Sequence, residues 1–125
     1  MSTLPLLVAV VDDDASLRLS FTRLLRAAGM HAVAYGSAED FLSDIAPPRF
    51  DCLVLDVRLG GMSGIELAQC LAGTGATVPV IFVTGYEDVE TRARAERAGG
   101  RAFFRKTDCG ADVLHAIRRL ACQEP

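Results

Sequence analysis

The chain has 125 residues, of which half are hydrophobic and 23% are charged, and its formal net charge is -3. This length and composition are typical of one soluble globular domain and exclude an intrinsically disordered chain. The net negative charge argues against direct binding of nucleic acid, which requires a concentrated positive surface. We therefore expect residues 1–125 to form a single domain.

The N-terminal apolar run, residues 4–11, is short, has no basic residue before it and ends at three aspartates. These features exclude a transmembrane helix and argue against a secretory signal, so we expect a cytoplasmic protein without membrane contacts. The cysteines lack the paired C-x-x-C spacing of zinc sites and redox centres. We expect all four to be reduced and to behave as small apolar residues: Cys52, Cys70, Cys109 and Cys122.

Apolar runs and helical repeats of apolar residues alternate along the chain. In chain order they predict a strand at 6–11, a helix with its apolar stripe at 17–28, a strand at 31–35, a helix with apolar residues at 41–45, a strand at 51–56, a helix at 64–73, a strand at 78–83, a helix at 89–98, a strand at 101–105 and a helix with its stripe at 113–121. The third strand is apolar enough to be buried on both faces.

The ends of the predicted helices carry signals of their own. Ser63 and Glu66 form a capping box, in which Ser63 bonds forward and Glu66 bonds back. Gly29 is expected to end the first helix in the left-handed conformation, and Pro47-Pro48 to stop the second. Three further residues are predicted N-caps: Asp14, Ser37 and Asp88.

Strict alternation of strands and helices with short loops predicts an α/β fold: a doubly wound parallel sheet of five strands with helices on both faces. In such sheets the functional groups collect at the carboxyl ends of the strands. Four predicted strands end on polar side chains that would share this edge: Asp12 to Asp14, Asp56, Thr84 and Lys106.

Carboxylates gathered at one edge repel one another unless a cation compensates their charge. Oxygen ligands of this kind suit Mg²⁺, which takes one or two protein carboxylates together with phosphate oxygens. Phosphoryl transfer requires positioning and charge compensation, to which the ammonium group of Lys106 and the hydroxyl of Thr84 can contribute. The sequence therefore predicts a Mg²⁺ pocket around Asp56, with Asp56 itself as a phosphoryl acceptor.

Five short motifs resemble the receiver domain of bacterial two-component response regulators: Val10-Val11-Asp12-Asp13, Leu53-Val54-Leu55-Asp56, Met62-Ser63-Gly64, Val83-Thr84-Gly85 and Phe103-Phe104-Arg105-Lys106. The resemblance covers essentially the whole chain. Thr84-Gly85 and Ser37-Ala38-Glu39 are most similar to regulators of the nitrogen-fixation type, which have a helix-turn-helix output domain. The resemblance implies a flavodoxin-like (βα)5 fold with strand order 2-1-3-4-5.

The resemblance also implies a role for each matching residue. Asp56 would accept phosphate from a histidine of a sensor kinase, in a transfer and later autodephosphorylation that the domain itself catalyses, so that it is not an enzyme in the usual sense. Asp13 would ligate Mg²⁺ directly, Asp12 mostly through water, and the backbone carbonyl of Arg58 would complete the protein ligands. Lys106 would contact the phosphoryl group.

In the family, Thr84 and Phe103 form a switch that changes the surface of the last two helices and the strand between them. That surface would control output, through a separate DNA-binding domain, and a phosphorylation-dependent homodimer is a further hypothesis. Phe104 must face the opposite side of its strand from Phe103. The fourth helix offers the core only Val89 and several alanines, and each absent CH₂ group forgoes about 0.8 kcal/mol of burial. We therefore expect it to be the most mobile helix.

Two positions depart from the family pattern. Thr107 replaces the proline that usually follows the lysine with a cis bond. A cis peptide to another residue costs about 3 kcal/mol, so we expect either a trans bond with a displaced loop or a strained cis bond. Gly60 replaces a proline that is common after the acceptor strand, and with Gly61 it should make that loop more flexible.

Two other functions are compatible with parts of the pattern. A haloacid-dehalogenase-like phosphatase would use Asp12 and Asp14 as its Asp-x-Asp motif, but the chain is short for that fold and Asp56 would have no role. Thr107 and Gly60 favour a degenerate receiver that only binds proteins. The presence of all the expected site residues argues against it: Asp12, Asp13, Asp56, Thr84 and Lys106. His31 and His115 have no partner at ligand spacing.

Overall fold

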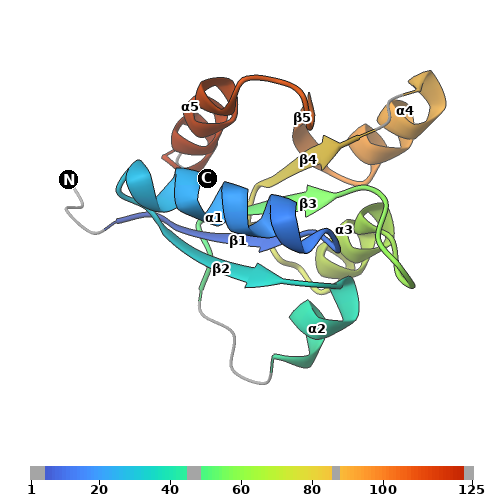
Figure 1. Ribbon diagram of the computed structural model, residues 1–125. Helices are drawn as coiled ribbons and strands as arrows, with labels where there is room; N and C mark the ends of the chain where they lie inside the picture. Colours follow the sequence, from blue (N-terminus) through green and yellow to red (C-terminus); the bar gives the residue numbers. More distant parts are fainter. Residues whose placement is uncertain (1–4, 45–48, 86–87, 123–125) are drawn as a thin grey trace.

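Five strands alternate with five helices in this computed structural model, which describes residues 5–44, 49–85 and 88–122. Figure 1 shows the strands in one sheet with helices on both sides of it. The strands are β1 (Leu7–Val11), β2 (His31–Tyr35), β3 (Cys52–Asp56), β4 (Val80–Thr84) and β5 (Gly100–Arg105). The helices are α1 (Ala15–Ala27), α2 (Ala38–Ser43), α3 (Gly64–Gly73), α4 (Val89–Arg97) and α5 (Gly110–Ala121).

The strands pair in parallel in the order β2-β1-β3-β4-β5, which confirms the predicted doubly wound fold. Every residue of β3 and of β4 is buried, because helices cover the sheet on both faces. The chain winds in opposite directions from β1 and β3, so the crevice at the carboxyl ends of these neighbours is the expected place for a ligand site.

The two faces of the sheet carry separate cores, since successive residues of a strand point to opposite sides. On one face Leu53 and Leu55 pack with apolar residues of α2, α3 and α4. On the other, Cys52 and Val54 pack with apolar residues of α1 and α5. The helices therefore divide into a pair and a trio across the sheet (Figure 1).

The local signals at helix ends are confirmed. The side chain of Asp14 accepts backbone N–H bonds at the start of α1, and Ser63 and Glu66 form both bonds of the capping box. Gly29 follows α1 with a φ of 84°, the left-handed conformation expected there. Ser37 and Asp88 cap α2 and α4.

β4 begins two residues later than predicted and includes Thr84 as its last residue. Pro79 has no N–H to donate to a strand ladder, which accounts for the later start. The predictions made for residue 4, residue 45 and Pro47-Pro48 lie outside the described residues. In the part of the chain that the structure describes, no helix is long and apolar enough to cross a membrane.

The prediction that Val89 contributes to the core is wrong, because 89% of its surface is exposed. The part of the prediction that concerns the alanines holds for Ala95, which α4 buries. Six residues separate the two positions, which corresponds to roughly 240° of rotation at 3.6 residues per turn, so they cannot share one face of the helix. The helix is thus held by a smaller contact than its sequence suggested.

The prediction that the cysteines act as apolar packing residues holds for one of the four. Cys52 is fully buried in β3, and burial raises the pKa of its thiol to about 12. The other three are exposed and do not serve as apolar packing residues: Cys70, Cys109 and Cys122. Cys109 lies at the N-cap of α5, and Cys70 and Cys122 lie on or after helices where the apolar stripe passes them by. All four are free thiols.

Candidate functional site

Four strands bring polar side chains to one edge of the sheet. Asp12 directly follows β1, Asp56 ends β3, Thr84 ends β4 and Lys106 directly follows β5. The register of the strands places these ends side by side. Val11 at the end of β1 pairs with Leu55, and Asp56 pairs with Val83 of β4. The alternation of strands and helices therefore assembles the site from segments that are far apart in the sequence.

Three carboxylates form an acidic cluster at this edge. One oxygen from each of Asp12, Asp13 and Asp56 lies within 4.8 Å of the others. Asp12 and Asp56 are buried, whereas Asp13 is exposed. The cluster is thus a pocket with a buried floor and one carboxylate at the solvent boundary.

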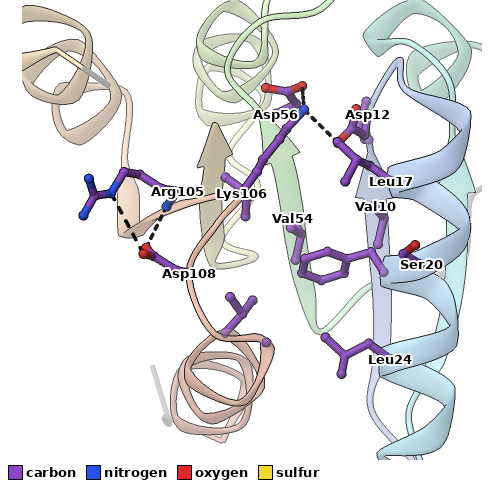
Figure 2. A pocket seen from close by; sticks show the side chains of 15 residues that line it. Val10, Asp12, Leu17, Ser20, Leu24, Val54, Asp56, Arg105, Lys106 and Asp108 are labelled. Atoms are coloured by element: carbon purple, nitrogen blue, oxygen red, sulfur yellow. Dashed lines mark hydrogen bonds and ion pairs between the residues drawn. The ribbon is translucent and has the colours of Figure 1, made fainter. Parts of the chain in front are cut away.

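Lys106 reaches into the acidic cluster (Figure 2). Its Nζ lies 2.7 Å from Oδ2 of Asp56 and 3.3 Å from Oδ2 of Asp12. Burial raises the pKa of Asp56 above its usual value. The hydrogen bond from Lys106 lowers this pKa and the charge of Asp12 raises it, so that the net shift is upward. Burial alone would lower the pKa of Lys106, but the hydrogen bond and charge of Asp56 and of Asp12 outweigh it and raise the pKa. Lys106 is therefore a stably protonated donor at the acceptor carboxylate.

The peptide bond between Lys106 and Thr107 is trans, as in the first of the two expected alternatives, and the side chain of Lys106 still reaches Asp56. The loop displacement that this alternative included stays a prediction. A turn closed by hydrogen bonds between Asp108 and Arg105 holds this loop. Oδ2 of Asp108 accepts the N–H of Arg105 at 2.8 Å, and the N–H of Asp108 donates back to the carbonyl of Arg105 at 2.9 Å. The N–H of Lys106 also donates to the carbonyl of Thr84 at 2.8 Å. Asp108 was not predicted, although an aspartate that accepts a nearby backbone N–H is a common turn signal.

The β1–α1 turn is held by contacts that the sequence did not reveal. Arg18 on α1 donates from Nη1 to the carbonyl of Asp12 at 2.8 Å. Oδ1 of Asp12 accepts the N–H of Asp14 at 2.9 Å, and Asp14 itself caps α1 as predicted. The orientation of Asp12 therefore depends on α1 as well as on β1.

The two residues of the predicted switch lie on neighbouring strands. Thr84 is completely buried at the end of β4. Phe103 on β5 is partly buried against the core on the α3 and α4 side, and the guanidinium of Arg92 lies 5.5 Å from its ring centre. Phe104 packs with the core on the α1 and α5 side, which confirms that the two rings point in opposite directions.

The loop after β3 continues the site. The N–H of Arg58 donates to Oδ1 of Asp56 at 3.1 Å, so that both oxygens of this carboxylate accept a hydrogen bond. A cavity of about 180 Å³ lies beside the site, between α1 and the loop after β5 (Figure 2). Asp12, Asp56 and Lys106 lie at one end of it, and the remaining lining combines apolar side chains such as Val54 with the polar side chains of Ser20, Arg105 and Asp108.

The sequence model of the response regulator receiver domain matches residues 8–118. The chain belongs to this family. A receiver domain is a regulatory module rather than a classical enzyme, and the order of its five strands is that of the CheY-like flavodoxin fold. The resemblance of the five motifs is thereby confirmed at the level of the whole chain.

Individual relatives agree with this assignment. Nodulation protein W of Bradyrhizobium diazoefficiens is 40% identical over 111 residues, which are 89% of this chain and 49% of that protein. A receiver protein from Burkholderia phymatum is 39% identical, with a TM-score of 0.82 over 93% of this chain and 94% of that one. The crystal structure of FixJ-N is 31% identical, with a TM-score of 0.88 over 98% of each chain. The receiver domain described here spans about half the length of the curated relatives it matches.

The chemistry of the donor set fits a hard divalent cation. Three carboxylates and one ammonium group leave two negative charges when all are ionised, and Lys106 contacts both Asp12 and Asp56. Such an excess is stabilised by a cation with oxygen ligands. Receiver domains generally bind Mg²⁺ through an acidic pocket of this kind.

Proposed function

We propose that Asp56 is the phosphoacceptor of this receiver domain and takes phosphate from a sensor histidine kinase. The observation that carries the proposal is the environment of the carboxylate at the end of β3. It is buried, it accepts hydrogen bonds from Lys106 and from the N–H of Arg58, and two further carboxylates lie beside it. This combination fixes an oxygen nucleophile next to groups that can compensate phosphoryl charge.

In the proposed transfer, a carboxylate oxygen of Asp56 attacks the phosphorus of a phosphohistidine. A P–O bond forms and the P–N bond breaks, and its electron pair stays on the imidazole nitrogen of the kinase, which takes up a proton from the solvent. Lys106 lies close enough to Asp56 to contact a phosphoryl oxygen once the acyl phosphate exists. In autodephosphorylation, water attacks the phosphorus, inorganic phosphate leaves and the carboxylate of Asp56 is restored.

The proposed protein ligands for Mg²⁺ are the carboxylates of Asp13 and Asp56 and the backbone carbonyl of Arg58, with Asp12 acting through water. When bound, the cation would withdraw charge from the phosphoryl oxygens and so assist the approach of one anion to another. Arg18 would keep Asp12 oriented toward this position, since it holds the carbonyl of Asp12.

We propose that phosphorylation acts on the output surface through Thr84 and Phe103. Thr84 would turn toward the phosphoryl group and Phe103 would fill the space it leaves, changing the surface of α4, β5 and α5. The relatives include proteins named as transcriptional regulators, which supports control of transcription by a separate DNA-binding domain. We further propose a cytoplasmic location, a single domain over residues 1–125 and a phosphorylation-dependent dimer through the α4–β5 face.

The experiment is incubation with Mg²⁺ and acetyl phosphate followed by intact-mass analysis. We expect the wild-type chain to gain the mass of one phosphoryl group, and Asp56→Asn to gain none. Phosphorylation that is lost in Asp12→Asn but retained in Asp56→Asn would instead favour the phosphatase alternative, in which Asp14 would need to be free rather than engaged in capping α1. No gain of mass in the wild-type chain would support the binding-only alternative.

A further inference from the structure

A glutamate from α2 contacts the loop that follows the acceptor strand. Oε2 of Glu39 accepts the backbone N–H of Met62 at 2.8 Å, a contact between residues that are 23 positions apart. The loop, residues 57–63, joins Asp56 to α3 and contains Gly60 and Gly61 in succession. Two consecutive glycines leave a chain segment freer to change conformation, so a contact from outside the loop adds to the bond from the N–H of Gly64 to the carbonyl of Val57 that already spans it.

The backbone of the loop is shaped around this carboxylate. Gly61 has a φ of 76°, and a Cβ atom added there would lie 2.6 Å from Oε2 of Glu39. A Cβ atom added at Gly60 would meet nothing within 4 Å. The end of the Glu39 side chain therefore lies directly against Gly61, whose left-handed φ favours glycine, while a Cβ atom at the neighbouring Gly60 would enter open space. The hydrogen bond from Met62 also lowers the pKa of Glu39, so the carboxylate is charged at neutral pH.

We infer that Glu39 is a positioning residue for the phosphorylation site. By holding Met62, it fixes the glycine-containing loop and with it Arg58, whose N–H donates to Asp56 and whose carbonyl is a proposed Mg²⁺ ligand. The inference rests on the proposed function of Asp56. The motif Ser37-Ala38-Glu39 does not by itself indicate this contact, because the contact depends on how α2 packs beside the loop.

The alternative is that Glu39 only stabilises α2 as an acidic residue in the first helical turn. Asp40 offers the matched control. It lies in the same turn of α2, is also exposed, and has the same charge. Loss of Asp40 should affect the helix as loss of Glu39 does, but should leave the loop in place.

The test measures the affinity for Mg²⁺ by calorimetry and the rate of phosphorylation by acetyl phosphate at limiting and at saturating Mg²⁺. For Glu39→Ala we expect both the affinity and the rate at limiting Mg²⁺ to fall roughly three- to tenfold, the effect of losing one such hydrogen bond. Glu39→Gln keeps an oxygen that can accept the N–H of Met62 and should restore most of the loss. Asp40→Ala should match the wild-type protein in both measurements.

Two glycine substitutions test the same idea from the side of the loop. Gly60→Ala adds a side chain into open space and reduces the freedom of the loop, so it should partly rescue Glu39→Ala. Gly61→Ala forces the carboxylate away and should resemble Glu39→Ala, and adding Glu39→Ala to it should cause little further loss. Circular dichroism confirms that each variant is folded before it is compared.

The outcomes separate the two claims. If wild-type protein neither binds Mg²⁺ nor gains phosphate, the proposed function fails and this inference fails with it. If wild-type protein does both but Glu39→Ala equals it, only the role of Glu39 is overturned. Equal losses in Glu39→Ala, Glu39→Gln and Asp40→Ala would likewise overturn it, since they would indicate a general effect of charge on α2.

Discussion

α3 and α4 pack against the same face of the sheet, but they are attached to it very differently. α3 begins with a complete capping box and buries four residues: Gly64, Ile65, Leu67 and Ala68. α4, which lies wholly within the described part of the chain, buries only Ala95 and leaves its single valine exposed. The difference indicates that one helix is fixed to the sheet while its neighbour is held by a small contact.

The first turn of α3 also lies directly against the end of β3. A Cβ atom added at Gly64 would be 2.1 Å from the carbonyl oxygen of Asp56, so only glycine permits this approach. α4 follows Thr84 rather than Asp56, and its N-cap Asp88 belongs to the loop beyond that strand. The helix with the larger buried face thus lies against the proposed phosphorylation site, and the helix with the smaller buried face follows the proposed switch residue.

The largest expected effect is on stability at α3. Leu67 is fully buried, so Leu67→Ala should lower the free energy of unfolding by about 2–5 kcal/mol, through lost burial and a residual cavity. Urea denaturation followed by circular dichroism measures this change. A loss below 1 kcal/mol would contradict the view that α3 is firmly packed.

Mg²⁺ should stabilise the folded domain by binding at the proposed site, which lies next to the start of α3. At a concentration 100 times its dissociation constant, an ion that binds only the folded domain stabilises it by about 2.7 kcal/mol. We expect this gain in thermal unfolding of the wild-type domain and its loss in Asp13→Asn, which removes a proposed ligand. Equal stabilisation of both proteins would place the ion elsewhere.

Amide hydrogen exchange compares the two helices directly. We expect amides of α4 to exchange at least about tenfold faster than those of α3, since α4 can open without exposing much apolar surface. Addition of Mg²⁺ should slow exchange in the loop after β3 and leave α4 unchanged. Uniformly slow exchange across residues 89–98 would refute the expectation that α4 is the most mobile helix.

The smallest effect is expected at the exposed end of α4. Because 89% of Val89 is exposed, Val89→Ser should change the free energy of unfolding by less than about 0.5 kcal/mol. The same denaturation measurement as for Leu67→Ala provides the comparison. A destabilisation similar to that of Leu67→Ala would show that Val89 does contribute to packing.

The fold was predictable because its signals are local or periodic. Apolar runs ended by polar residues marked the strands, and caps such as Ser63 with Glu66 marked the helices. The convergence of Asp12, Asp56 and Lys106 followed from the rule that parallel strands present their carboxyl ends at one edge. These features required no knowledge of how the helices pack.

The remaining features depend on tertiary packing and could not be predicted. A helix with few apolar residues has a weak periodic pattern, so Val89 was wrongly included with the alanines on the buried face of α4. The contact between Glu39 and Met62 joins segments whose spacing in the sequence has no meaning by itself. Whether the bond after Lys106 was cis or trans was equally open, because either isomer could be compensated by the surrounding loop.

The central claim is that Asp56 is the acceptor, and identification of the modified residue tests it most directly. After incubation with Mg²⁺ and acetyl phosphate, borohydride reduces an acyl phosphate to an alcohol, which converts the modified aspartate to homoserine. Peptide mass spectrometry then locates the change. We predict homoserine at position 56 alone; homoserine at position 12 or 13 instead, or at no position, would contradict the account.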